Sequence, residues 1–199
     1  MSVNPWIDAP PPALAEPERG SEGSEDQAIV VPRWAPGAEV EAVGGLSSHP
    51  VQEPGGLWVV GAHGGAGTST LADLLGAGDA GTSWPTSVSG TVRVLVVART
   101  HASGIERARE VGIQWAAGGL AGVELVGVVW VADAPGRLPR PLREPLELAS
   151  GAFPVGFHVP WVGAWRITVP ASADAAPRDV RRTLRQIASL TQRGSENDE

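Results

Sequence analysis

Apolar runs of strand length alternate with segments of helical periodicity between about residue 55 and residue 170. The runs are rich in Val and Leu, and they lie at residues 57–61, 92–98, 124–132 and 155–159. The segments between them repeat apolar residues at helical spacing, and they lie at residues 68–75, 103–117 and 138–149. Strands that are apolar on both faces and alternate with helices are typical of a covered parallel sheet. We therefore predict an α/β fold with a small parallel sheet of about four strands flanked by helices.

Two of the predicted helices are amphipathic. Segment 103–117 carries apolar residues on one face, namely Ile105, Ala108, Val111 and Trp115. A last helix is predicted for residues 177–192, with Val180, Leu184, Ile187 and Thr191 on one side and Arg178, Arg181, Arg182 and Arg185 on another. Pro141 and Pro145 are expected to confine or kink the helix at 138–149. Residues 76–90 are predicted to form a loop.

The two ends of the chain differ in composition from its centre. Residues 1–54 are rich in Pro, Gly, Ser and Glu and carry nine acidic residues and two arginines, whereas residues 55–199 carry thirteen of each. An acidic segment rich in Pro and Gly, without sustained apolar periodicity, buries too little apolar surface to offset the entropy of folding. We expect a disordered tail at 1–54, an α/β domain at 55–170, a C-terminal amphipathic helix at 171–193 and a disordered acidic tail at 194–199.

Composition excludes several chemistries. The chain has no Cys and no Tyr, and all 15 of its basic residues are Arg. Without Cys there is no disulfide framework, and the 4 His are dispersed, so we expect no metal centre and assign no catalytic residue. The longest apolar run is too short to span a bilayer and no secretory signal is recognised, which predicts a cytoplasmic protein without membrane insertion. The net charge of −7 does not favour nucleic acid as a partner.

The loop Gly61-Ala62-His63-Gly64-Gly65-Ala66-Gly67 carries the most specific chemical signal, because it joins a predicted strand to a predicted helix. In such a turn, backbone N–H groups and the positive end of the helix dipole can hold a phosphate group. The predicted phosphate-binding residues are Gly64, Gly65, Ala66, Gly67, Thr68, Ser69 and Thr70. His63 lies inside the loop, either as a cation near the phosphate or as a residue packed in the turn.

This loop resembles the deviant Walker A motif of the ParA/MinD family of P-loop NTPases, which reads G-K-G-G-x-G-K-[ST]-[ST]. Five positions match the pattern: Gly64, Gly65, Gly67, Ser69 and Thr70. His63 replaces the signature lysine of the family, and Thr68 replaces its phosphate-binding lysine. The lysine-less loop is also similar to that of an uncharacterised actinobacterial family.

The resemblance extends over residues 56–165 with a central deletion. It implies that the strand at 126–132 ends beside the base of a nucleotide, so that Asp133, Ala134 and Pro135 face the base or ribose. Asp133 could equally cap the turn that follows it. The strand with the magnesium-linked Asp and the Walker B strand have no counterpart, because the only acid in segment 76–91 is Asp79, which is expected in a loop.

The substitutions favour binding over catalysis. In P-loop enzymes a lysine supplies a full charge to the β- and γ-phosphates, and a Walker B carboxylate helps to place magnesium. The resemblance without these groups implies a non-catalytic or weakly nucleotide-binding regulatory protein, in plasmid, mobile-element or partition functions. Its ligand would be ATP or another nucleotide, and magnesium is not expected. Two alternatives stay open: an active ATP or GTP hydrolase that uses an Arg in place of the lysine, and a purely structural protein-interaction module.

The same loop also fits the G-x-x-x-G-x-G turn of short-chain dehydrogenases. That enzyme activity is excluded because the chain lacks the Tyr and Lys of the catalytic pair, although a non-catalytic dinucleotide binder stays open. Protein partners are expected at the N-terminal tail or at the Arg-rich helix. For that helix, the candidates are an acidic partner, DNA phosphate and the protein's own acidic tail.

Overall fold

The computed structural model describes residues 45–52, 56–168 and 171–193, with side chains in the last helix up to residue 189. All the elements below lie in the compact unit formed by residues 41–199. The predictions of disorder for residues 1–44 and 194–199 lie outside the described residues.

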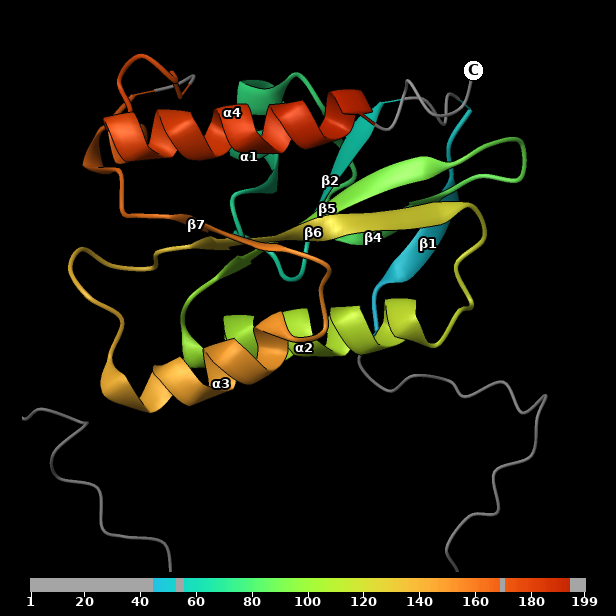
Figure 1. Cartoon of the computed structure of the whole chain (residues 1–199), viewed down its shortest axis with the longest axis horizontal. Coiled ribbons are helices and arrows are strands. Elements are labelled where there is room, and N and C mark those ends of the chain that lie inside the picture. The colour runs from blue at the N-terminus through green and yellow to red at the C-terminus, as the bar shows by residue number, and fades with distance from the viewer. Residues whose placement is uncertain (1–44, 53–55, 169–170, 194–199) are drawn as a thin grey trace, which may run out of the picture. The chain divides into compact units, whose positions relative to one another are not determined.

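Five parallel strands form the main sheet, in the order β3-β2-β5-β6-β7 (Figure 1). These strands are β2 (Leu57–Gly61), β3 (Gly78–Asp79), β5 (Val92–Arg99), β6 (Val123–Val131) and β7 (Gly156–Val159). β5 and β6 are the longest, and their inner residues are buried because helices cover both faces of the sheet.

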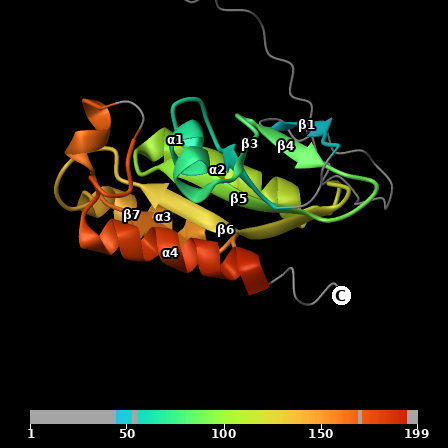
Figure 2. The same cartoon turned by 90° about the horizontal axis from the view of Figure 1, so that it is seen from above.

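The helices form one layer on each face. Figure 1 shows α1 (Thr68–Leu75) and α4 (Arg178–Arg193) on one side of the sheet, and α2 (Ala102–Ala116) and α3 (Arg140–Ser150) on the other. Figure 2 looks onto the first of these faces, where α1 and α4 lie side by side. The predicted parallel α/β architecture with flanking helices is therefore confirmed.

Alternation along β5 divides the core between the two faces. Val94 and Val96 pack with the apolar residues of α2 and α3, whereas Leu95 and Val97 pack with those of α1 and α4. The apolar face predicted for α4 is buried at Val180, Leu184 and Ile187, while Thr191 lies outside the described side chains. Likewise, α2 buries Ile105, Ala108 and Val111.

Three sequence predictions need correction. The main sheet has five strands, because residues 76–90 hold the short strands β3 and β4 (Ser83–Thr86) instead of a plain loop. Asp79 accordingly ends a strand, and its carboxylate accepts a hydrogen bond from the Gly81 N–H.

The second correction concerns the helix α3. It continues past Pro145, and Pro141 lies in its first turn, where a missing N–H costs no helical hydrogen bond.

The third correction concerns the predicted tail. Residues 47–50 form β1 (Ser47–Pro50), which pairs in parallel with β4 as a separate two-stranded sheet. Hydrogen bonds between distant residues hold this pair in place, because Gln114 accepts from the Leu46 N–H and donates to the Leu46 carbonyl, both at 2.8 Å. The same amide oxygen accepts from the indole N–H of buried Trp84 at 2.9 Å. The chain is therefore ordered against the domain before residue 54.

The order of the strands favours a crevice at the carboxyl-terminal end of the sheet, between β2 and β5. The chain leaves β2 through α1 to reach β3 on one side, and it leaves β5 through α2 to reach β6 on the other side. Adjacent strands that send their connections in opposite directions leave an opening beyond their carboxyl ends, where ligands of open α/β sheets bind. The residues that follow β2 and β5 therefore define the candidate site.

Candidate functional site

The loop after β2 depends on glycine at two positions. Gly65 has a φ of 75° and Gly67, the residue before α1, has a φ of 104°. Side chains rarely adopt this left-handed conformation. A Cβ atom at Gly64, Gly65 or Gly67 would have no heavy atom within 4 Å, so the loop faces open space. Backbone groups here are accessible to a small ligand.

The first turn of α1 directs its backbone N–H groups toward this opening. The first helical hydrogen bond runs from the Leu71 N–H to the Gly67 carbonyl at 3.0 Å. Within the described residues, the N–H groups of Thr68, Ser69 and Thr70 have no acceptor, and Gly67 provides no side-chain cap. Uncapped N–H groups and the helix dipole place partial positive charge at this point.

His63 fastens the loop to the end of β5. Its Nε2 accepts a hydrogen bond from the Arg99 N–H at 3.1 Å, and its Nδ1 lies 2.9 Å from the Gly64 carbonyl. Both contacts are satisfied by the neutral ring with its proton on Nδ1. Of the two possibilities for His63, the packed residue thus fits the geometry.

Gly104 belongs to the same contact. A Cβ at Gly104 would overlap the Arg99 carbonyl and approach His63 Nε2 to 2.9 Å, so the first turn of α2 must pass close to the ring. His101 caps α2 by accepting a hydrogen bond from the Gly104 N–H, and its ring centroid lies 5.0 Å from that of His63. The two loops therefore form one packed unit.

Arg99 bridges the loops with its side chain. Its Nε donates to the Gly65 carbonyl at 3.4 Å and its Nη1 donates to the Ala132 carbonyl at 3.2 Å. Partial burial lowers the pKa of Arg99 from its ordinary value, and the positive charge of Arg166 lowers it further, against the opposing effect of Asp133. Two guanidinium groups thus lie close enough to repel each other.

Arg166 comes from the short η1 helix (Gly163–Arg166), far from the loop in sequence. Its guanidinium carbon lies 4.6 Å from the centre of the Trp161 ring, a cation–π contact that fixes the direction of an exposed side chain. No carboxylate within the described part of the chain forms an ion pair with either Arg99 or Arg166.

These groups surround a cavity of about 130 Å³. Its lining includes Gly67 and Thr70 from the loop and the first turn of α1, Arg99 and Ala132 from the ends of β5 and β6, and Arg166 from η1. At about 30 Å³ per water molecule, the volume suits a small anion, and it is smaller than the several hundred Å³ typical of a site for a whole nucleotide. Chemically, this is a small cavity with two cations and a helix N-terminus, and none of the described acidic residues lines it.

The predicted phosphate-binding residues divide into three groups. Gly67 and Thr70 line the cavity, and Gly64, Gly65 and Ser69 are exposed beside it. Ala66 is fully buried in the core on the α1 side of the sheet. Thr68 is also buried, and its hydroxyl packs onto Gly61 at the end of β2 instead of facing the cavity.

The predicted base or ribose residues lie beyond the end of β6. Asp133, Ala134 and Pro135 are exposed and line a second cavity of about 580 Å³, on the α2 and α3 side of the sheet. Ala132 and Pro160 line both cavities, so the two are neighbours. Asp133 also anchors its own loop, because its N–H donates to the Thr100 hydroxyl at 3.3 Å.

Sequence reasoning missed the two arginines. Arg99 directly follows the apolar run at 92–98, so the carboxyl-end rule for parallel strands could have identified it. Arg166 carries no such signal, because it lies in a short irregular segment after the last strand. Only the tertiary structure brings it to the loop.

Together, the fold and the site define a parallel α/β protein with a glycine-rich loop and two arginines where the strand connections change direction. The chain belongs to DUF6668, a family of unknown function, which matches residues 55–184. No curated protein and no solved structure matches the chain. Across the part of the chain that the structure describes, we find no helix with the length and apolar character needed to cross a membrane.

Proposed function

We propose that this protein is a non-catalytic regulatory protein that binds a nucleotide through its phosphate groups, beyond the carboxyl ends of β2 and β5. The observation that carries the proposal is the cavity of about 130 Å³, where Arg99, Arg166 and the first turn of α1 converge. An anion there would be attracted by the positive charges of two side chains and could accept hydrogen bonds from backbone N–H groups.

The two arginines take the place of the missing loop lysine. A unit negative charge at 4 Å from a guanidinium is attracted by about 4 kcal/mol near a protein surface, before the cost of desolvation. An anion between Arg99 and Arg166 would also relieve the repulsion between them, which adds to burial in lowering the pKa of Arg99. The site is therefore arranged for a phosphate group without any lysine in the chain.

The surroundings support binding without rapid hydrolysis. Among the described residues, no Asp or Glu lines this cavity. Asp79 holds the Gly81 N–H, and Asp133 faces the neighbouring cavity. The hydrolase alternative requires a carboxylate to place magnesium against the phosphates, and neither residue stands at that position.

The neighbouring cavity would accommodate the rest of the nucleotide. Because Ala132 and Pro160 line both cavities, a ligand with its phosphate near Arg99 could extend past them toward Asp133, Ala134 and Pro135. The order of strand, glycine-rich loop and helix supports the proposed relation to ParA/MinD proteins. A regulatory function in partition or mobile-element maintenance is part of the same proposal.

Isothermal titration calorimetry with ATP, ADP, GTP, NAD and pyrophosphate, each with and without magnesium, tests the proposal. We expect a nucleotide and pyrophosphate to bind, and Arg166→Gln to weaken both at least tenfold. A tenfold loss needs about 1.4 kcal/mol, a third of the attraction given above. Arg140→Gln is the matched control, since Arg140 is exposed at the start of α3 and lines neither cavity.

Three results would contradict the proposal, the third of them only in part. One is the absence of heat for all five ligands with a protein whose circular dichroism shows a folded α/β domain. Another is equal affinity of Arg166→Gln and the parent protein, which would place the ligand elsewhere. Binding of pyrophosphate without binding of any nucleotide would support the anion site but would reject a nucleotide as its ligand.

A further inference from the structure

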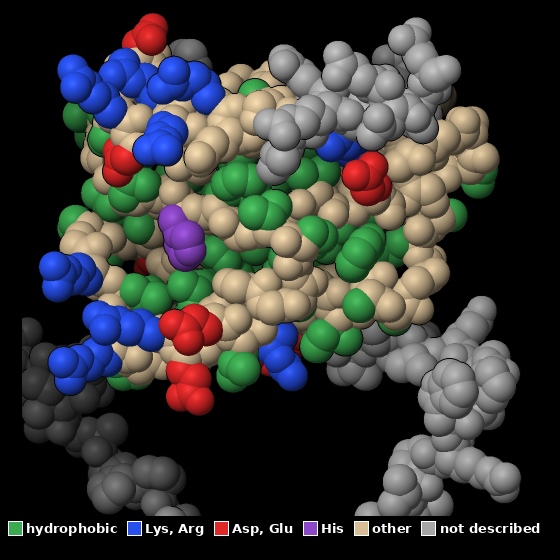
Figure 3. Space-filling view, in the orientation of Figure 1, with side chains coloured by type: hydrophobic (Ala, Val, Ile, Leu, Met, Phe, Trp, Pro, Cys, Tyr) green, Lys and Arg blue, Asp and Glu red, His purple; other side chains and the backbone are tan. Residues whose placement is uncertain are grey.

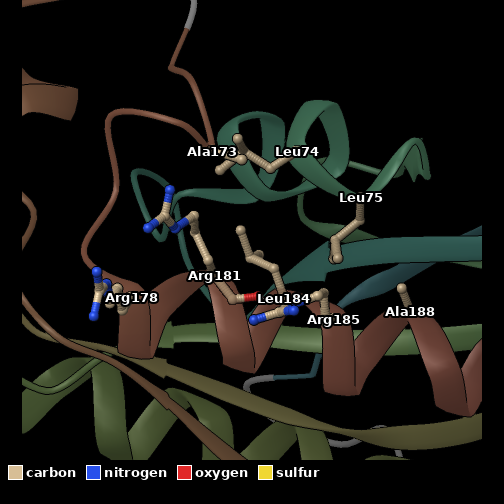
Figure 4. A pocket seen from close by; sticks show the side chains of 8 residues that line it. All are labelled: Leu74, Leu75, Ala173, Arg178, Arg181, Leu184, Arg185 and Ala188. Carbon is tan, nitrogen blue, oxygen red and sulfur yellow. Dashed lines mark hydrogen bonds between the residues drawn. The ribbon is translucent and has the colours of Figure 1, made fainter.

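A second feature of the protein is a groove on the helical face that carries α1 and α4. It has a volume of about 630 Å³ and lies between the C-terminal half of α1 and the N-terminal half of α4 (Figure 4). Its apolar part is formed by Leu74, Leu75, Leu184 and Ala188. The groove is separate from the anion site, because the two share no lining residue among those the structure describes.

The lengths of the two helices explain why the groove is open. α1 has 8 residues and α4 has 16, which correspond to lengths of about 12 and 24 Å at 1.5 Å per residue. The short helix covers only part of the flank of the long one. Leu74 and Leu75 therefore stay partly exposed at the end of α1, beside Leu184, which is buried at the base of the groove.

Arginines line the α4 side of this groove. Arg178, Arg181 and Arg185 follow one another at spacings of three and four residues, so they lie on the same side of the helix. Figure 3 shows the basic side chains gathered over the first half of α4. Within the described residues, no carboxylate forms an ion pair with these three arginines, although Arg185 Nε donates to the Arg181 carbonyl at 3.3 Å.

We propose that this groove is a docking site for a short amphipathic segment of a partner protein, with carboxylates next to aliphatic side chains. The carboxylates pair with Arg181 and its neighbours, and the aliphatic side chains cover Leu74 and Leu75. The arginines span about 10 Å along α4, a distance matched by acidic residues at spacings of three and four in a helix. This proposal does not depend on the anion site.

The mixed character of the groove is the argument for a peptide and against nucleic acid. A phosphate backbone uses basic residues but leaves apolar side chains uncovered. Here leucines and arginines line the same groove, so a ligand must bring both apolar groups and negative charge. An acidic amphipathic peptide satisfies both requirements.

The chain supplies a probe of the required chemistry. Residues 21–32 read Ser-Glu-Gly-Ser-Glu-Asp-Gln-Ala-Ile-Val-Val-Pro, with three acidic residues followed by four aliphatic ones. A fluorescein-labelled peptide of this sequence is titrated with the full-length protein, and binding is followed by fluorescence anisotropy. The control peptide replaces the carboxylates by amides: Glu22→Gln, Glu25→Gln and Asp26→Asn.

The structure offers a closely matched pair of protein variants. Arg181→Gln removes a partly buried arginine of the groove, whereas Arg182→Gln removes the exposed neighbour on the same helix, which does not line the groove. We expect Arg181→Gln to weaken peptide binding at least fivefold and Arg182→Gln to change it less than twofold. The neutral peptide should bind at least fivefold more weakly than the acidic one.

A second form of the full-length protein separates a partner segment from the chain's own segment. It carries Glu22→Gln, Glu25→Gln and Asp26→Asn within the protein. If only this form binds the acidic peptide, the occupant is the protein's own segment, and a partner protein is rejected. If neither form binds, or if Arg181→Gln and Arg182→Gln have equal effects, the docking site itself is rejected. Tighter binding of a 12-nucleotide single strand with the same dependence on Arg181 would assign the groove to nucleic acid instead.

Discussion

Gly61→Ala tests how the loop is built, because it adds one methyl group at the joint between β2 and α1. A Cβ at Gly61 would overlap the Thr68 hydroxyl and would lie 3.2 Å from the His63 carbonyl oxygen and 3.3 Å from that of Gly81. Two of the three neighbours are backbone atoms, which cannot turn away as a flexible side chain would. Overpacking of this kind typically costs about 1–3 kcal/mol.

We therefore expect Gly61→Ala to lower the free energy of unfolding by about 2–3 kcal/mol, measured by urea denaturation with circular dichroism. For a domain of this size, the melting temperature should fall by about 4–12 °C. Gly64→Ala is the matched control from the same loop, since its Cβ would meet no atom within 4 Å and its φ is not in the left-handed region. It should change stability by less than about 0.5 kcal/mol.

A double variant identifies the atom responsible. Thr68→Ala removes the hydroxyl that the new methyl would overlap, so Gly61→Ala with Thr68→Ala should be at least about 1 kcal/mol more stable than the sum of the single effects. Equal stability of Gly61→Ala and Gly64→Ala, or strict additivity in the double variant, would refute the reasoning. Thr68 would then not point toward β2.

Three further results are expected. ATP turnover should stay at background, so steady-state phosphate release at about 1 per second, abolished by Arg99→Gln, would contradict binding without hydrolysis. If pyrophosphate binds with a Kd of about 1 mM, about 10 mM of it should raise the melting temperature of the parent protein by roughly 3–6 °C and that of Arg166→Gln, which binds at least about tenfold more weakly, by no more than about 2 °C, as differential scanning fluorimetry can measure. Gln114→Leu should destabilise the domain by about 2–3 kcal/mol in urea, because the Leu46 backbone and the buried Trp84 indole lose their partners, whereas Ile113→Leu at the exposed neighbouring position should have little effect.

The elements that the sequence predicts best are those whose limits are set by glycine. The predicted bounds of β2 and α1 agree with the structure, because an apolar run ends at Gly61 and left-handed glycines flank the helix at positions 67 and 76. The predicted limits of β5 differ from the observed ones by one residue at the C-terminal end. Those of α2 and β6 differ by one residue at both ends. The local sequence pattern is sufficient to predict an element where the apolar residues of the pattern are also the residues buried in the core.

The strands that the sequence missed are held by partners far along the chain. β1 consists of Ser47-Ser48-His49-Pro50, which has no apolar alternation and contains a proline. It pairs with β4, and its neighbour Leu46 is held by Gln114, 68 residues away. No local pattern encodes such contacts. For the same reason, sequence analysis could not predict Arg166 as a site residue, since its position near the glycine-rich loop depends on the whole sheet.

The direction of the Thr68 side chain was equally unpredictable. Alignment with the ParA/MinD pattern places Thr68 where the family has its phosphate-binding lysine, but the structure turns the side chain into the joint with Gly61. Thr68→Lys therefore introduces a long charged chain at a buried point. The positive charge beside the loop comes from Arg99 and Arg166, which belong to other elements.

The helix α1 is short enough that its two ends serve different surfaces. Thr70 and Leu71 line the anion cavity, while Leu74 and Leu75, one turn later, form part of the groove beside α4. At 1.5 Å per residue, Thr70 and Leu74 lie only about 6 Å apart along the helix axis. If an anion in the cavity and a partner in the groove each bind more tightly to the same position of α1, each raises the affinity of the other by the same factor. Binding of a small anion at one end of α1 would then be coupled to binding of a protein at the other end, to the same degree in both directions.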